Sequence, residues 1–320
     1  MTKRFGQGDY VYELVPGWGA LPSGWEYKDV VGIREDSRGR IVVFNRGTHP
    51  VVVFDRDGKL LTTWGDGVFT RPHGLQIGPD GTIYCVDDQD HTVRAFTPDG
   101  KLRLTLGTPG HASQTGWISS YDTLPGGGPF NRPTNIAVAS NGDLYVSDGY
   151  GNCRVHRFGA DGTHKESWGS AGQGAGQFRL PHGVCAEPFG SVLVGDRAND
   201  RIQRFDLDGR YLGEWTGVRA PDDIFRDASG AYYVAELGKA AAVVGDLGAR
   251  VTIRNRHGHI LSAWGDEGDP ASDGNFAAPH AICVDAHGDL YVGEVTFTAR
   301  ISRGLVGPDT HRLQKFARVH

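Results

Sequence analysis

Short apolar runs recur along the chain at regular intervals, separated by polar turns that are rich in glycine. Six segments share one order: a first apolar strand, usually opened by proline, a glycine turn, a second strand closed by an acid, a third strand ending in phenylalanine, a second glycine turn and a Trp-Gly finish. The pattern is most complete over residues 71–107 and 180–215. Four short strands in each ~40–50 residues are typical of a propeller blade. The sequence therefore predicts an all-β fold, a six-bladed β-propeller.

The repeats predict a single domain over residues 1–320. Repeat six ends at its third strand, residues 311–319, and the segment at residues 10–18 matches the fourth-strand pattern. We expect this N-terminal strand to close blade six, because the closure would remove an exposed sheet edge. The expected blades cover approximately residues 28–67, 70–107, 130–169, 178–217, 218–265 and 276–319, with strand 10–18 added to the last.

Histidine occupies the same position, directly after the opening proline, in repeats two, four and six: His73, His182 and His280. In a propeller the first strand of each blade is innermost, so these side chains are expected to converge at the mouth of the central channel. Neutral imidazole suits zinc and related divalent ions, and three protein ligands with one open position are typical of a catalytic zinc site. In the alternative interpretation each histidine caps its strand and bonds a backbone carbonyl.

The loops that follow the second strands are expected on the same face as the histidines. Arg46 and Arg197 occupy equivalent positions there, and such a pair can hold a carboxylate through bidentate hydrogen bonds. Tyr150 stands where most repeats have a small or polar residue. A phenol beside a metal ion and an arginine can serve as a base. The alternative for all three is that they are ordinary loop residues.

Other polar residues of this face are open to more than one interpretation. Asp222, followed by Asp223, stands at the histidine position in repeat five, and two interpretations are open: it binds a second cation, or it hydrogen-bonds water. Long insertions at residues 108–129, 237–248 and 295–310 resemble lids over a site. We expect substrate contacts from the first insertion, from His111, Trp117 and Tyr121. The acids that close the second strands are expected to bond turn amides; they are Asp87, Asp148 and Asp196.

The composition of the chain argues against some classes of binding partner. The net charge is −5, and Lys and Arg are scattered, so nucleic acid is not an expected partner. No apolar leader opens the chain and no run reaches the length of a spanning helix, so we expect a cytoplasmic protein without a membrane partner. Four cysteines without a CxxC pair predict reduced, mostly buried thiols; they are Cys85, Cys153, Cys185 and Cys283.

The repeats resemble NHL repeats. Residues 130–158 and 176–205 are closely similar to the lyase domain of peptidylglycine α-amidating enzymes. That family is a six-bladed propeller with zinc on three blade-start histidines, and it cleaves peptidyl-α-hydroxyglycine into a peptide amide and glyoxylate. The resemblance implies that Tyr150 is the catalytic tyrosine and that Arg46 and Arg197 are the family's two arginines. It also implies a zinc site on the three histidines, His73, His182 and His280.

The chain departs from the family beside the third histidine. Ala281 and Ala278 stand where the family has Asp and Met, which argues against the family's structural calcium. Gly151 replaces a disulfide cysteine. We therefore predict a zinc-dependent C–N lyase, or one that uses another divalent transition metal, acting on a small carbinolamide-like or α-hydroxy acid substrate that carries a carboxylate.

Three other interpretations stay open. One is a hydrolase that uses the same zinc site, and another is a non-catalytic NHL-repeat scaffold that binds a protein or ligand. The third is a calcium-dependent lactonase-type propeller, against which the three-histidine column argues. The sequence predicts neither the exact substrate nor the oligomeric state.

Overall fold

The computed structural model describes residues 3–121, 124–238, 248–266 and 268–319. Within these residues the chain forms six sheets of at least four antiparallel strands, which confirms the expected all-β class and the six-bladed β-propeller. By contacts the chain divides into two compact units: unit 1 has residues 1–66 and 222–320, and unit 2 has residues 67–221. Most of the second predicted insertion, residues 239–247, lies outside the described residues.

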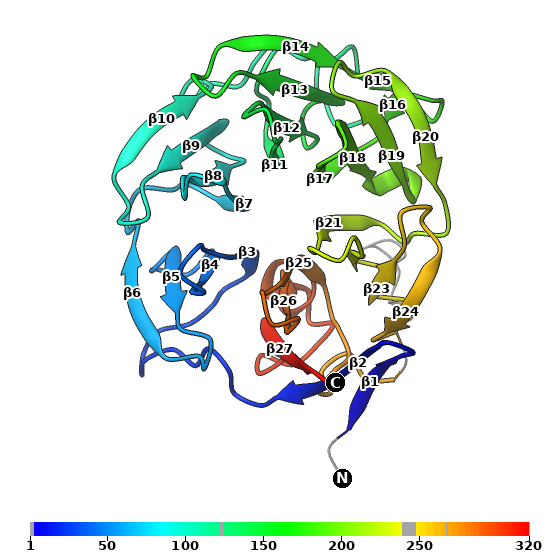
Figure 1. Cartoon of the computed structure of the whole chain (residues 1–320). Helices are drawn as coiled ribbons and strands as arrows, with labels where there is room; N and C mark the ends of the chain where they lie inside the picture. Colours follow the sequence, from blue (N-terminus) through cyan, green and yellow to red (C-terminus); the bar gives the residue numbers. More distant parts are fainter. Residues whose placement is uncertain (1–2, 122–123, 239–247, 267, 320) are drawn as a thin grey trace. The chain divides into compact units, whose positions relative to one another are not determined.

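Unit 2 contains three blades, whose first strands lie side by side in the order β7, β11 and β17 (Figure 1). A parallel pair, β15 and β16, and the short 3-10 helix η1 complete the unit. The elements are β7 (Pro72–Ile77), β8 (Ile83–Asp87), β9 (Thr92–Phe96) and β10 (Leu102–Leu106); β11 (Pro133–Val138), β12 (Leu144–Asp148), β13 (Arg154–Phe158) and β14 (His164–Trp168); β15 (Ser170–Ala171) and β16 (Gln177–Phe178); and β17 (Pro181–Glu187), β18 (Ser191–Asp196), η1 (Arg197–Asn199), β19 (Arg201–Asp206) and β20 (Tyr211–Trp215).

Unit 1 contains the other three blades. In the last of these sheets the order is β1-β2-β27-β26-β25, and β2 pairs with β27 so that Leu14 faces Phe316 in register. The elements are β3 (Val30–Glu35), β4 (Ile41–Asn45), β5 (Val51–Phe54) and β6 (Leu60–Trp64); β21 (Pro221–Arg226), β22 (Tyr232–Glu236), β23 (Arg250–Arg254) and β24 (Ile260–Trp264); and β25 (Pro279–Val284), β26 (Leu290–Glu294), α1 (Thr296–Ala299), η2 (Ile301–Arg303), β27 (Leu313–Arg318), β2 (Tyr10–Val15) and β1 (Arg4–Gln7).

The core lies between the faces of neighbouring blades. In unit 2, Tyr145 and Val155 of one blade pack with Val192 and Phe205 of the next. Each second strand is fully buried, as in β12, whereas the fourth strands are mostly half-buried or exposed, as in β14. This gradient follows from the pattern of the sequence, because the apolar alternation is strongest in the first three strands of each repeat.

Two local features recur in the blades, a glycine turn and a set of hydrogen bonds to a buried acid. The turn between first and second strands uses glycine with positive φ, as at Gly81 (+80°) and Gly142 (+84°), a conformation that side chains rarely adopt. The acid that ends the second strand accepts amide hydrogen bonds from the segment before the first strand, as expected: Asp87 from Arg71, Asp148 from Asn131 and Asp196 from Arg179. These bonds anchor the loop that leads into each first strand.

Two further findings concern the described residues as a whole. All four cysteines are buried thiols, and none of them is part of a disulfide. No helix found there combines the length and the apolar character that a membrane span requires.

Candidate active site

His73 and His182 lie at the starts of β7 and β17, directly after Pro72 and Pro181. In both strands the pairing register shifts just after the proline. Such an irregularity frees the residue from regular alternation and re-aims its side chain. Both histidines are almost completely buried, with 0% and 1% of their surfaces exposed, so the imidazoles are held inside unit 2.

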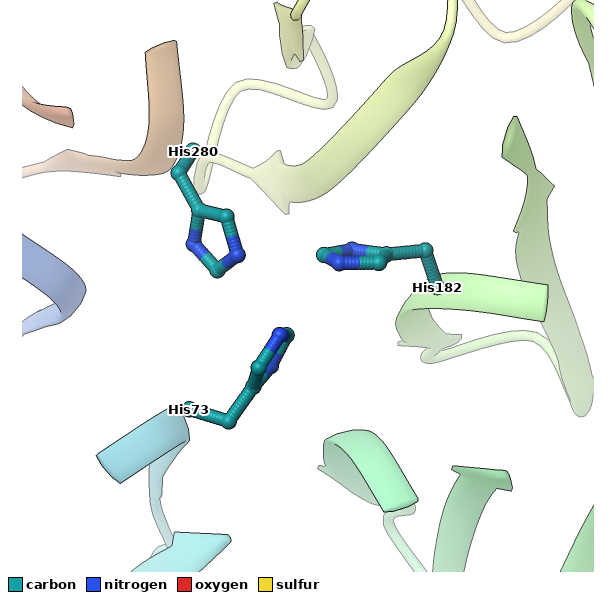
Figure 2. Close-up of side chains that lie close together, drawn as sticks. All are labelled: His73, His182 and His280. Atoms are coloured by element: carbon teal, nitrogen blue, oxygen red, sulfur yellow. The ribbon is translucent and has the colours of Figure 1, made fainter. Parts of the chain in front are cut away.

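The two imidazoles face each other. Their ring centroids lie 4.9 Å apart at an interplanar angle of 63°, and Figure 2 shows both rings pointing to the same space. One ring nitrogen of each lies within 4.8 Å of the other. His73 donates its Nδ1–H to the carbonyl of Thr134 at 2.6 Å, which leaves a lone pair on Nε2. A backbone carbonyl behind the ring is the usual support of a metal-ligating histidine, so His73 is oriented as a ligand to a divalent transition metal would be.

His280, in unit 1, repeats this arrangement. It begins β25 after Pro279 and is 4% exposed, and its Nδ1 lies 3.2 Å from the carbonyl oxygen of Val31. Val31 and Thr134 occupy equivalent positions, the second residue of the first strand in their own blades. His73 and His280 therefore share one tautomer-setting contact, with the backbone of the neighbouring blade.

Tyr150 joins the two histidines of unit 2. Its hydroxyl oxygen lies 3.0 Å from Nε2 of His73 and 3.2 Å from Nε2 of His182. Arg197 donates to the same oxygen from Nη1 at 3.3 Å. The structure thus brings together four residues that the sequence predicted for the site, two histidines, the tyrosine and one arginine, around a single phenol oxygen.

Arg46 and Arg197 occupy the same backbone position in their blades. The amide of each donates to the residue that precedes the first strand: Arg46 to the carbonyl of Asp29, Arg197 to that of Leu180, both at 2.9 Å. Their side chains differ. The Arg46 guanidinium forms a salt bridge with Asp29 at 3.1 Å, and Asp29 also accepts from Thr298. In unit 1, then, this arginine is held by a buried carboxylate.

The predicted substrate residues of the first insertion separate into two groups. Tyr121 packs with Trp117, with ring centroids 4.8 Å apart, and both lie against the core of unit 2. Burial raises the pKa of Tyr121, Tyr150 raises it further, and Arg197 and Arg132 oppose the shift, so Tyr121 lies within electrostatic range of the site. His111 is exposed, and its Nδ1–H donates to the carbonyl of Pro109 at 2.8 Å, in a turn of the same loop.

Comparisons with known proteins place the chain in a family. A model of the NHL repeat matches residues 130–158. NHL repeat-containing protein 3 from Homo sapiens is 30% identical to the chain over 260 residues, which cover 74% of the chain and 72% of that relative. The chain belongs to the NHL-repeat family.

A second relative of this NHL-repeat protein is peptidyl-alpha-hydroxyglycine alpha-amidating lyase 1 from Drosophila melanogaster, which is 32% identical over 261 residues. The match covers 74% of the chain and 45% of the fly protein, so the chain spans less than half the length of that relative. Among solved structures, a gluconolactonase from Xanthomonas campestris has a TM-score of 0.65 at 13% identity, covering 96% of this chain and 89% of that one. That similarity shows the fold alone.

Two arginines of the NHL-repeat site were missed from the sequence. Arg71 and Arg132 each stand immediately before the opening proline of a blade, and their guanidinium carbons lie 6.0 Å and 5.4 Å from the centre of the Tyr150 ring. Arg71 also forms a salt bridge with buried Asp88. The signal was present, because an Arg-Pro pair opens blades two and three and no other blade.

The acids of repeat five are both buried. Asp223 lies 3.2 Å from Nη1 of Arg34 and accepts the amide of Ile282 at 3.2 Å, which makes it a structural ion pair inside unit 1. Asp222, at the histidine position of this NHL repeat, is 0% exposed.

Proposed function

We propose that this NHL-repeat protein is a metal-dependent lyase that breaks the C–N bond of a small carbinolamide-like α-hydroxy acid. The observation that carries the proposal is the Tyr150 hydroxyl, set between the Nε2 atoms of two histidines and one Arg197 donor, at 3.0, 3.2 and 3.3 Å. A relative that is 32% identical is named an amidating lyase, which supports the same chemistry.

The metal ligands of the proposal are His73, His182 and His280. The donor set fits zinc or a related divalent transition metal, since the Nδ1 atoms of His73 and His280 are bonded to backbone carbonyls, which puts the lone pair of each ring on Nε2. When bound, such an ion supplies Lewis acidity that makes the substrate hydroxyl easier to deprotonate. Because Ala281 replaces the family's aspartate, the proposal includes no calcium.

The chain's own residues perform the proton transfers. Arg197 donates to the Tyr150 oxygen and orients the phenol, and Tyr150 takes the proton of the substrate hydroxyl. The C–O bond becomes a carbonyl, the C–N bond breaks, and its electron pair goes to the amide nitrogen. Tyr150 returns the proton to that nitrogen, so an α-hydroxyglycine derivative yields an amide and glyoxylate with no net change in protons.

The arginines bind the carboxylate beside the reacting carbon in this proposal. A guanidinium matches a carboxylate in geometry and charge, and each of Arg46 and Arg197 is fixed at its backbone by a 2.9 Å hydrogen bond. Trp117 and Tyr121 then contact the rest of the substrate, since they pack against the same unit as Tyr150.

The test measures metal content and glyoxylate release from an N-acyl-α-hydroxyglycine. We expect about one metal ion per chain, and His182→Ala should lose both the metal and turnover. Tyr150→Phe should keep the metal and lose turnover by about 100-fold or more, because proton transfer by a positioned side chain contributes on that order. Tyr84→Phe, in β8 of the same unit, is the matched control. Full activity in metal-free protein would overturn the proposal.

The relative named NHL repeat-containing protein 3 favours a second candidate, a binding scaffold without catalysis, because that name carries no activity. The scaffold predicts metal-loaded protein that releases no glyoxylate from any N-acyl-α-hydroxyglycine. The same assay therefore separates the two candidates.

A further inference from the structure

Three guanidinium groups surround Tyr150 within unit 2. Arg197 donates to its hydroxyl at 3.3 Å, while Arg132 and Arg71 lie against its ring, with their guanidinium carbons 5.4 Å and 6.0 Å from the ring centre. The proposed reaction requires a carboxylate partner for Arg197. It leaves the other two arginines, on the ring side of the phenol, without a role.

Arg71 is already partly neutralised. Its guanidinium forms a salt bridge with Asp88, whose side chain is fully buried, and the Arg71 side chain is 23% exposed. The salt bridge fixes the direction of the Arg71 guanidinium. A fork held in this way by a carboxylate on one side can still donate to a ligand on another, because guanidinium carries five N–H donors.

Arg132 is different. Among the residues that the structure describes, its guanidinium has no hydrogen bond or salt bridge, and it contacts the ring of Tyr150. Its backbone, however, is tightly held: the amide donates to Nδ1 of His91 at 3.1 Å, and the carbonyl accepts from the amide of Tyr150 at 3.3 Å. The residue has a φ of +65°, which is uncommon outside glycine. Strained backbone of this kind is concentrated at ligand-binding positions.

These contacts indicate the charge that a ligand on the ring side of Tyr150 should carry. Burying Arg132 under a neutral substrate would remove its water without supplying a counter-charge, which is unfavourable. A carboxylate placed beside the Tyr150 ring would receive charge-assisted hydrogen bonds from Arg132 and from the oriented Arg71. Such a carboxylate is distinct from the one that Arg197 binds, because Arg197 is at the hydroxyl end of the same side chain.

We infer that the substrate is a small dicarboxylate, whose second carboxylate lies on the amide side of the bond that breaks and is bound by Arg132 and Arg71. This inference rests on the proposed lyase function. An N-acyl-α-hydroxyglycine with an acyl chain ending in a carboxylate has this form. For the succinyl compound the products are succinamate and glyoxylate, and the second carboxylate takes no part in the bond changes.

The test compares two substrates of equal chain length, N-succinyl-α-hydroxyglycine and N-butanoyl-α-hydroxyglycine, at constant ionic strength. Because a hydrogen bond to a charged group contributes on the order of a tenfold change in affinity, we expect kcat/KM to favour the succinyl compound by about tenfold or more. Arg132→Gln should bring the ratio close to one, and Arg71→Gln should lower it. Arg103→Gln is the matched control, since this arginine of the same unit is half exposed and bonds Thr82. A wild-type ratio near one overturns the inference.

A binding measurement separates this inference from the lyase function. N-succinylglycine and N-butanoylglycine lack the hydroxyl and cannot be cleaved, so calorimetry with the zinc-supplemented protein reports recognition alone. Tighter binding of N-succinylglycine that Arg132→Gln abolishes supports the second carboxylate site, even if neither hydroxyglycine is turned over and the lyase proposal fails. Turnover of both hydroxyglycines with equal affinity for the two glycine derivatives overturns the inference and leaves the lyase function standing. Absence of binding by both derivatives also overturns it.

Discussion

The segments that follow β4 and β18 make the same backbone hydrogen bond, but their arginine side chains contact different groups. Each closes with a polar residue, Asn45 or Asp196, and continues into an arginine whose amide bonds the residue before the first strand. At β18 the Arg197 side chain reaches the phenol oxygen of Tyr150. At β4 the Arg46 side chain is paired with buried Asp29. The repeat therefore determines where an arginine stands, and its neighbours determine whether its guanidinium contacts the phenol or a buried carboxylate.

The largest expected effect is a loss of kcat when Arg197 is substituted, compared with a smaller loss when Arg46 is substituted. Arg197→Gln removes a donor aimed at the oxygen that takes the proton, and removal of such a donor costs about 100-fold or more in kcat. Arg46→Gln should act mainly on KM, since its contact lies with Asp29 rather than with Tyr150. Steady-state glyoxylate release measures both. Equal losses of kcat in the two variants would show that the arginines do not differ in role.

Substitution of Arg46 should reduce the stability of the fold more than substitution of Arg197, the reverse of the order expected for kcat. Arg46→Gln leaves Asp29 as a buried carboxylate without its cation, and breaking one side of a buried ion pair costs about 3 kcal/mol. The double variant Arg46→Gln with Asp29→Asn should recover part of that loss, because the uncompensated charge is removed. Urea unfolding of the two variants and of Arg197→Gln gives the comparison. If Arg46→Gln unfolds at the same urea concentration as the wild type, Asp29 does not depend on the arginine.

A smaller effect, on metal affinity, is expected when the hydroxyl of Thr134 is removed. Thr134 Oγ1 lies 3.1 Å from the carbonyl oxygen of His182, and the Thr134 carbonyl accepts from His73, so one residue touches both. Thr134→Val should keep the carbonyl and remove the hydroxyl. We expect metal affinity to fall by about tenfold, as for other supporting contacts of metal ligands. Zinc competition with a chelator measures it, with Thr62→Val on exposed β6 as the control.

The smallest effect concerns the end of β26, where Glu294 closes the strand. Burial alone lowers the pKa of His311, but the carboxylate of Glu294, 2.6 Å from its Nδ1, outweighs burial and raises the pKa above its ordinary value. The resulting stabilisation is fully present below the unfolded pKa of about 6.5 and is lost as the pH rises through the higher folded value.

His311→Asn should therefore reduce the free energy of unfolding by about 1 kcal/mol at pH 5.5 and by less at pH 9. Chemical unfolding of both proteins at the two pH values checks this. A larger difference at pH 9 than at pH 5.5 would contradict the assigned direction.

The sequence predicted the features that recur at the same position in several repeats. The six blades, the histidine positions and the equivalent slots of Arg46 and Arg197 all follow from aligning the chain with itself, and Tyr150 could be singled out against that alignment. The sequence could not predict the side-chain partners of the two arginines. Asp29, the partner of Arg46, and Tyr150, the partner of Arg197, each lie in a segment remote in sequence from the arginine. The insertion at residues 108–129 has no counterpart in the other repeats, so nothing in its pattern separated Tyr121 from His111.

Arg71 and Arg132 were missed for a physical reason as well. They lie just outside the strand pattern, before a proline, in a segment whose local sequence resembles an ordinary blade entry. Only the fold brings both of them to the ring of Tyr150, which follows a different strand.

His73 and His280 each take a hydrogen-bond acceptor from the main chain of a neighbouring blade, from Thr134 and from Val31. A peptide carbonyl is present whatever the side chain, so the acceptor survives any substitution that preserves the backbone. The alternate blades accordingly carry three different residues at this position, Val31, Thr134 and Asp222. This support therefore tolerates sequence drift at residues 31 and 134 as long as the two strands keep their backbone.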